Sequence, residues 1–386
     1  MKRLFPVLLV VFFISCSTPQ DKLLGSLSDP NTELMAHCFR YVGEYDGWRY
    51  GVYNAGYNST VEHPKNLDID LKLCRWKTDD IEHREISQIW CTGKGISDYF
   101  RPPYDPTGII EGSVLHLLFC PGVDGRSTYV HVPYYLDTQE LGSEEVMTLD
   151  GEAITVVNVI NNYSSRTGIE IPWFTDGGPD TAFGIGMNVE IARYKEYYYS
   201  VISALASGYT EMIVRSRDLI HWETVSIPDF SSVCSADTFW EGVVRPLHDN
   251  VFAFTARLQS EDGVLYGLWN SETGCFSDLQ LIEGGITARP EFFEYKGRTY
   301  LYCNVYGPSS VEGYGSVYRS TSAIYKLSRD GRSIKRIRSK FIPEGIHYPT
   351  FYSEPDGSLY IIYSTDSRQL NPNEGRSNIA IERLAL

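Results

Sequence analysis

A β-hairpin signature near the C-terminus constrains this chain more than any other feature of its sequence. The segment 347–364 contains two short apolar runs joined by Pro355-Asp356-Gly357. In such a turn proline presets the backbone, aspartate bonds back to the main chain, and glycine accepts a positive φ. The first run opens on Tyr348, which proline follows. Four other segments open a hairpin in a similar way, usually with arginine where Tyr348 stands.

The hairpin recurs along the chain, and the repetition predicts the fold. Further hairpins are expected over 39–53, 100–119, 187–202, 243–255 and 288–303, and a third strand and often a fourth follow each one. Units of roughly 40–60 residues, each a small antiparallel sheet, are typical of propellers. We therefore predict an all-β protein, a six-bladed β-propeller of four-stranded antiparallel blades. The high content of tyrosine and glycine, 28 and 33 residues, agrees with β structure.

The predicted propeller is a single domain that covers residues 34–386. Its last unit lacks an outer strand, so the tether at 17–33 is a candidate for closing the ring. Residues 147–184 fit no unit. We expect them to be an inserted hairpin with a Gly/Pro/Asp loop at 175–181.

The first 16 residues have the features of an export signal. Lys2 and Arg3 precede an apolar run that ends at Ile14, which is too short to span a bilayer. A small residue before Cys16 resembles a bacterial lipoprotein signal, in which Cys16 carries the lipid. An ordinary secretory signal is the alternative. The first interpretation predicts a lipid-anchored protein of the bacterial cell envelope, at the outer membrane or cell surface.

The net charge of −15 argues against a nucleic-acid partner, because no basic face offsets phosphate repulsion. No two cysteines have CxxC spacing, and the sequence has no nucleotide loop, Ser-His-Asp set or metal-ligand cluster. We therefore expect no metal and no cofactor.

Local arginines can nevertheless bind an anion inside an acidic protein. The first strand of each propeller blade lines the central channel, so the blade openings are expected to face one funnel. That placement gathers Tyr348 with four arginines: Arg40, Arg101, Arg245 and Arg289. The guanidinium fork matches a carboxylate in bidentate geometry, which indicates a pocket for an acidic sugar. The alternative is that these arginines brace neighbouring blades through carboxylates such as Glu241 and Glu291.

In its order of motifs the chain resembles the sialidases. Phe39-Arg40-Tyr41 is similar to the start of their Phe/Tyr-Arg-Ile-Pro motif, whose arginine grips the substrate carboxylate. Glu62 stands where their acid/base aspartate would be, ahead of Asp68-Ile69. Asp68 and Asp70 are alternatives for that acid.

The later motifs follow in the same order. Glu241, with Arg257 sixteen residues on, resembles their glutamate and second arginine. Arg319 lies in the region of their third arginine, although Arg289 competes for that role. Tyr348 matches the spacing around their nucleophilic tyrosine. The resemblance thus implies a glycoside hydrolase with Tyr348 as nucleophile, Glu241 as its base and Glu62 as acid/base. Arg40, Arg257 and Arg319 would form the carboxylate clamp on an acidic oligosaccharide or glycoconjugate.

Two other functional classes stay open. The run from Ser216 to Glu223 is similar to turns in five-bladed furanosidase and related propeller hydrolases, which use carboxylates alone. Asp46, Glu190 and Glu241 are the acids that such a site would need. The other class is a non-catalytic glycan-binding propeller, which keeps the basic funnel without the chemistry.

Overall fold

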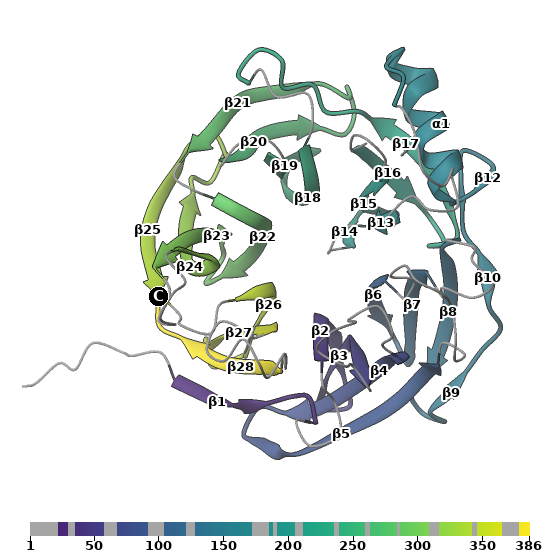
Figure 1. Cartoon of the computed structure of the whole chain (residues 1–386), viewed down its shortest axis with the longest axis vertical. Coiled ribbons are helices and arrows are strands. Elements are labelled where there is room, and N and C mark those ends of the chain that lie inside the picture. The colour runs from purple at the N-terminus through teal and green to yellow at the C-terminus, as the bar shows by residue number, and fades with distance from the viewer. Residues whose placement is uncertain are drawn as a thin grey trace, which may run out of the picture.

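The computed structural model is a ring of six β-sheets around a central axis (Figure 1). It describes residues 22–29, 35–57, 68–91, 104–120, 128–171, 185–187, 191–204, 211–234, 239–258, 263–283, 286–308, 316–341, 346–364 and 378–386. The prediction of an all-β, six-bladed propeller is confirmed. Each sheet is a blade whose first strand lies nearest the axis, and the pairing is antiparallel except where β11 (Thr148–Leu149) joins β17 (His221–Ser226) in the third blade.

The blades follow one another in chain order. Blade 1 consists of β2 (Met35–Tyr45), β3 (Trp48–Tyr57), β4 (Asp68–Lys77) and β5 (Asp80–Cys91). Blade 2 consists of β6 (Tyr104–Glu111), β7 (Val114–Cys120), β8 (Val130–Tyr135), β9 (Glu140–Leu141) and β10 (Glu145–Val146). Blade 3 consists of β13 (Ile185–Met187), β14 (Ala192–Tyr194), β15 (Tyr197–Ala204), β16 (Met212–Ser216) and β17 (His221–Ser226), with β11 (Thr148–Leu149) and β12 (Glu152–Ala153) added at its outer edge.

The last three blades have four strands each. Blade 4 consists of β18 (Phe239–His248), β19 (Val251–Leu258), β20 (Gly263–Asn270) and β21 (Phe276–Glu283). Blade 5 consists of β22 (Ile286–Tyr295), β23 (Arg298–Pro308), β24 (Ser316–Leu327) and β25 (Ile334–Phe341). Blade 6 consists of β26 (His347–Ser353), β27 (Leu359–Ser364), β28 (Ile379–Leu384) and β1 (Lys22–Ser26).

The outer strand of blade 6 comes from the other end of the sequence. β1 pairs antiparallel with β28, and the Leu27 N–H then donates to the Ile379 carbonyl at 2.8 Å. The Ser28 hydroxyl accepts from the Ile379 N–H at 3.0 Å. The two ends of the propeller are therefore held in one sheet, which closes the ring.

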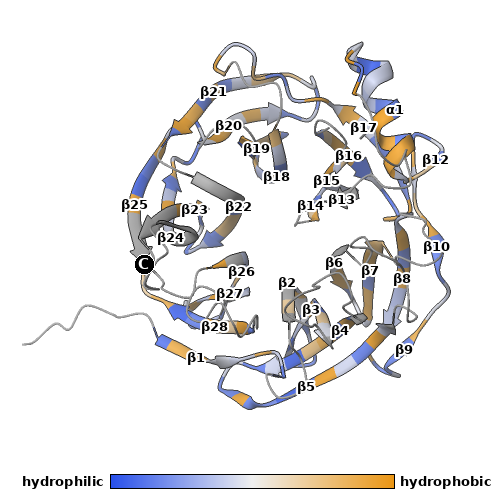
Figure 2. Ribbon diagram, in the orientation of Figure 1, coloured by the Kyte–Doolittle hydropathy of each residue, from blue (hydrophilic) through white to orange (hydrophobic). Residues whose placement is uncertain are grey.

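The hydrophobic core is divided among the six seams between neighbouring blades. One cluster fills each seam; the cluster between blades 6 and 1, for example, includes Phe39, Trp76, Tyr352 and Ile362. The outermost strand β5 contains both hydrophobic and hydrophilic stretches (Figure 2), and its hydrophilic run at 82–85 is mostly exposed. The packing of each blade against its two neighbours fixes where the inner strands lie around the axis.

The inserted segment differs from the hairpin that its sequence indicated. It begins as the hairpin β11–β12 and continues as the helix α1 (Val156–Thr167), which lies outside blade 3 (Figure 1). The Thr155 hydroxyl caps the first turn by accepting from the Asn158 N–H at 3.1 Å. The helix buries Val156, Val159, Ile160 and Tyr163, which share one face, against the seam of blades 2 and 3. The expected loop at 175–181 lies outside the described residues.

Five cysteines are buried thiols rather than disulfide partners: Cys38, Cys74, Cys120, Cys234 and Cys303. Across the described ranges, no helix has the length and apolar character needed to cross a membrane.

Candidate active site

The inner strands share one irregularity at their funnel end, which is the end opposite the hairpin turns. In five blades the pairing of the inner strand with its neighbour slips by one residue at the same place. The slips fall at 37–40, 104–107, 240–243, 288–291 and 347–350. Such β-bulges bend a strand and redirect a side chain, and they are frequent at barrel rims and beside active sites.

Two candidate catalytic residues stand at the same register position of this repeated bulge. Glu241 directly follows the last paired residue of β18, and Tyr348 does so in β26. Both have a positive φ, 58° and 50°, as does Cys38 (54°) in β2. Arg289 occupies the same register position in β22. A left-handed conformation at a non-glycine residue costs about 1–3 kcal/mol, and such strain persists where the surrounding structure imposes it.

Glu241 forms an ion pair with Arg257. The carboxylate Oε2 lies 3.6 Å from the Arg257 Nη1, and the side chains are only 5% and 15% exposed. Arg257 lies on β19 directly opposite Trp240, so the bulge turns the glutamate toward its partner. Two buried charges of opposite sign thus offset part of each other's desolvation.

Arg40 connects blade 1 with the strand that carries Tyr348. Its side chain is buried, and the Nη1 donates to the carbonyl oxygens of Phe39 and Pro349, both at 3.3 Å. Pro349 is the residue after Tyr348, which is itself only partly exposed. The contact therefore fixes the Arg40 guanidinium beside the bulge of β26.

Arg245 lies elsewhere than the funnel position that its motif suggested. It is close to the hairpin turn of β18, where the guanidinium Nη2 lies 3.5 Å from the Glu294 Oε1 on the neighbouring blade. The bulge at 240–243 places Arg245 two residues farther toward the turn end than Arg40 on its own strand. For this arginine the bracing interpretation holds.

The remaining candidates are described only in part. Arg289 lies on β22 and Arg319 on β24, but their side chains are outside the described residues. Glu62, Arg101 and Cys16 also fall outside the described residues. Among the alternatives for the acid, Asp70 is buried on β4 with Lys72 Nζ at 3.8 Å. Asp46, from the furanosidase interpretation, lies exposed in the turn between β2 and β3, at the end opposite the bulges.

A further carboxyl group beside Glu241 was missed in the sequence. Glu211, directly before β16, is 1% exposed, and its Oε1 accepts a hydrogen bond from the Gly242 N–H at 3.1 Å. Burial raises the pKa of Glu211 well above its ordinary value, the Gly242 hydrogen bond opposes that rise, and the charge of Glu241 adds to it. In the sequence Glu211 is a lone acid before an apolar run, and no motif marks it.

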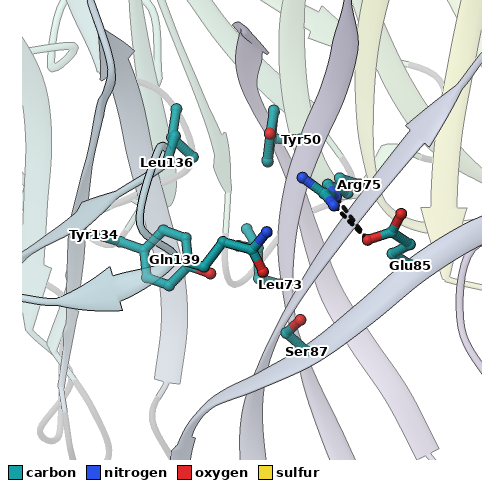
Figure 3. Close-up of a pocket in the computed structure, with 8 residues that line it drawn as sticks. All are labelled: Tyr50, Leu73, Arg75, Glu85, Ser87, Tyr134, Leu136 and Gln139. Carbon is teal, nitrogen blue, oxygen red and sulfur yellow. Dashed lines mark hydrogen bonds and ion pairs between the residues drawn. The ribbon is translucent and has the colours of Figure 1, made fainter. Parts of the chain in front are cut away.

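Two pockets lie at seams away from this site. The pocket in Figure 3, between blades 1 and 2, is lined by Tyr50 and Tyr134 and by the ion pair of Arg75 with Glu85. Its volume of about 10 Å³ suits one water and no sugar ring. The other pocket, of about 460 Å³, is at the turn end between blades 1 and 6, where Arg49 and Thr78 already bind Glu354. Neither pocket contains a residue of the bulges.

The fold is similar to that of solved sialidase structures. No protein-family model matches the sequence, and no curated protein sequence matches it. The Trypanosoma rangeli sialidase in complex with sialic acid superposes with a TM-score of 0.60 at 12% identity, over 95% of this chain and 59% of that one. A leech intramolecular trans-sialidase gives a TM-score of 0.55 at 12% identity, over 96% of this chain and 70% of its own length.

A third structure shows that the fold is not restricted to sialidases. An α-L-arabinofuranosidase of Fusarium graminearum superposes with a TM-score of 0.55 at 12% identity. The match covers 95% of this chain and 98% of that enzyme, whereas the chain spans only 59% of the Trypanosoma rangeli sialidase. The chain thus has a six-bladed propeller fold that known glycoside hydrolases share.

Proposed function

We propose that the protein is a glycoside hydrolase that removes an acidic sugar from the end of a glycan by a sialidase-like mechanism. The observation that carries this proposal is the ion pair of Glu241 with Arg257 at a bulge whose register position recurs at Tyr348. The position of Arg40 beside Pro349 supports it. The structures that share the fold include a sialidase with sialic acid bound.

The chemistry of the substrate explains why a tyrosine would serve as nucleophile. In a sialoside the anomeric carbon carries a carboxylate, which repels an anionic nucleophile. A neutral tyrosine avoids that repulsion, and a neighbouring carboxylate can accept its proton at the moment of attack. Sialidases are accordingly an exception to the use of two catalytic carboxylates.

In the proposed reaction the Tyr348 oxygen attacks the anomeric carbon while its proton passes to Glu241. The glycosidic bond breaks, and Glu62 supplies a proton to the leaving oxygen. Water then attacks the anomeric carbon of the glycosyl–tyrosine intermediate and loses a proton to Glu62. The bond to Tyr348 breaks, Glu241 returns the proton to the tyrosine oxygen, and the sugar is released. Arg40, Arg257 and either Arg319 or Arg289 would hold the substrate carboxylate.

A carboxylate-only furanosidase is the second candidate function. The structural similarity to the Fusarium graminearum arabinofuranosidase is the observation that favours it. Against it, Asp46 lies at the turn end of its blade, away from Glu241. Under this alternative Tyr348 has no chemical role.

The proposal is tested with purified protein, a fluorogenic sialoside, a panel of uronic-acid glycosides and an arabinofuranoside. Release of the fluorophore from an acidic glycoside supports it. Turnover of the arabinofuranoside alone supports the second candidate, and binding of acidic glycans without any turnover supports the glycan-binding propeller.

We further propose that Cys16 carries a lipid that anchors the protein in the bacterial cell envelope. The small residue before Cys16 and the preceding short apolar run support this. Replacement of Cys16 by serine should move the protein from the membrane fraction to the soluble one, and an unchanged distribution would contradict the anchor.

A further inference from the structure

Among the described residues, Glu211 is a buried carboxyl that touches the bulge of Glu241 without belonging to the motifs above. It stands at the start of β16 in blade 3 and reaches the inner strand of blade 4. Its Oε1 accepts the Gly242 N–H at 3.1 Å, so it binds the residue directly after Glu241. A strained segment of blade 4 is thus held by a side chain of blade 3.

Two side chains, those of Glu211 and Val201, lie close to the position that a Cβ on Gly242 would occupy. A Cβ on Gly242 would lie 2.8 Å from the Glu211 Oε2 and 2.9 Å from the Val201 Cγ1. A side chain at this position would therefore displace the Glu211 carboxyl group or Val201. Because Glu241 has φ 58° and Gly242 follows it, a shift of Gly242 would also rotate the Glu241 side chain.

We propose that Glu211 is a positioning residue, which holds the Glu241–Gly242 bulge and thereby fixes the direction of the Glu241 carboxylate. The inference rests on the proposed function as far as catalysis is concerned, whereas the effect on the bulge does not depend on the substrate.

The chemistry of Glu211 suits this task in its neutral form. The residue is 1% exposed, and burial raises its pKa well above the ordinary value, which favours the carboxylic acid over the carboxylate. A neutral acid still accepts the Gly242 N–H through one oxygen, and it adds no second negative charge beside Glu241. Its Oε2 is buried without a hydrogen-bond partner among the described residues, as expected where ionisation is unfavourable.

Two substitutions separate the hydrogen bond from the charge. Glu211→Gln keeps an oxygen acceptor and the neutral state, whereas Glu211→Met keeps the length and removes the acceptor. Tyr266→Phe is the matched control, since it removes a buried side-chain bond to a main-chain group, the Gly331 carbonyl at 2.6 Å, away from the bulge.

The first measurement needs no substrate. In protein labelled with ¹⁵N-glycine, hydrogen exchange of the Gly242 amide should be at least about tenfold faster in Glu211→Met, which corresponds to loss of one hydrogen bond. Exchange should be unchanged in Glu211→Gln and in Tyr266→Phe. Infrared difference spectra of wild type minus Glu211→Gln at neutral pH should contain the carbonyl band of a protonated carboxylic acid. Equal Gly242 exchange in all variants, or absence of that band, would overturn the inference.

The second measurement uses the fluorogenic sialoside. Glu211→Met should lower kcat by about 10–100-fold with little change in KM, because misplacement of a catalytic group by about 1 Å has an effect of this size. Glu211→Gln should keep kcat and its pH dependence, since it replaces one neutral group by another. A Glu211→Met enzyme with wild-type kcat would overturn the positioning role. If wild type turns over neither the sialoside nor any of the uronic-acid glycosides, the proposed function fails while the exchange experiment still decides this inference.

Discussion

Arg40 donates a hydrogen bond from its Nη1 to the carbonyl oxygen of Pro349 at 3.3 Å, across the seam that joins blade 1 to blade 6. The two residues are 309 positions apart in the sequence. Ring closure is therefore what brings Arg40 of blade 1 to the strand of Tyr348. The stability of the ring and the geometry of the site depend on the same seam.

Replacement of Arg40 by lysine should weaken the hydrolysis of acidic sugars. Lysine keeps the positive charge but loses the planar fork that can hold both a carboxylate and the Pro349 carbonyl. We expect kcat/KM for the sialoside to fall roughly 10–100-fold, mainly through KM, as for loss of a charge-assisted hydrogen bond. Arg245→Lys, at the brace between blades 4 and 5, is the control and should change kcat/KM less than about twofold. Equal effects of the two substitutions on kcat/KM would contradict a role for Arg40 in substrate binding.

The ion pair of Glu241 and Arg257 should respond differently in stability and in activity. Glu241→Gln removes the carboxylate from a largely buried ion pair, and breaking such a pair costs about 3–5 kcal/mol of unfolding free energy. The double variant Glu241→Gln/Arg257→Met should recover most of that stability and none of the activity. Denaturant unfolding and the sialoside assay measure both quantities. Recovery of activity along with stability would show that the pair is only structural.

Removal of the closing strand should destabilise the whole propeller. A chain without residues 1–28 loses the pairing of β1 with β28, the Leu27 side chain (0% exposed) and the Ser28 bond to Ile379. We expect a loss of at least about 3 kcal/mol, from one buried leucine and the hydrogen bonds together. The control lacks only residues 1–21 and keeps every one of these contacts. Identical thermal unfolding of the two truncated proteins would contradict a closing role for β1.

A buried histidine pair predicts loss of stability in acid. The His116 Nδ1 lies 2.9 Å from the His131 Nε2 in blade 2, and the two rings are stacked. Burial lowers the pKa of both, and that of His131, which the charge of His116 lowers further, falls to about 4. Asp218 opposes the shift of His131, and Glu111 opposes that of His116. The ordinary value is 6.5, so the unfolded chain binds more protons between pH 6.5 and about 4. Stability should therefore fall as the pH drops through that window.

The double variant His116→Gln/His131→Gln provides the comparison for the pair. Its melting temperature should depend less on pH between 6.5 and 4 than that of the wild type. A wild-type melting temperature that is flat across this window would contradict the assignment.

The sequence predicted the fold because each hairpin carries its own local signal, such as Pro355-Asp356-Gly357 before an apolar strand. The helix α1 was also visible in principle, because Val156, Val159, Ile160 and Tyr163 have helical spacing behind the cap at Thr155. The surrounding β repeats led us to expect only a hairpin there. For this segment, the spacing of its own apolar residues was a better guide to secondary structure than the repeat of hairpins around it.

The site was less predictable, because strand register determines it. Arg40 and Arg245 look equivalent beside their hairpins, yet the one-residue bulges place Arg245 farther toward the turn end of its blade. Glu211 could not be found from the sequence, since its role depends on contact with a glycine 31 residues away on another blade. Both cases depend on tertiary packing that no short motif contains.

The most direct test of the account is the rate at which Tyr348→Phe hydrolyses the fluorogenic sialoside, relative to wild type. The substitution removes one hydroxyl from a partly exposed side chain, so the fold should be retained and can be checked by thermal unfolding. We expect a loss of kcat of at least about 10³-fold, because the nucleophile is gone. A folded Tyr348→Phe protein with the full activity of the wild type would contradict the tyrosine mechanism.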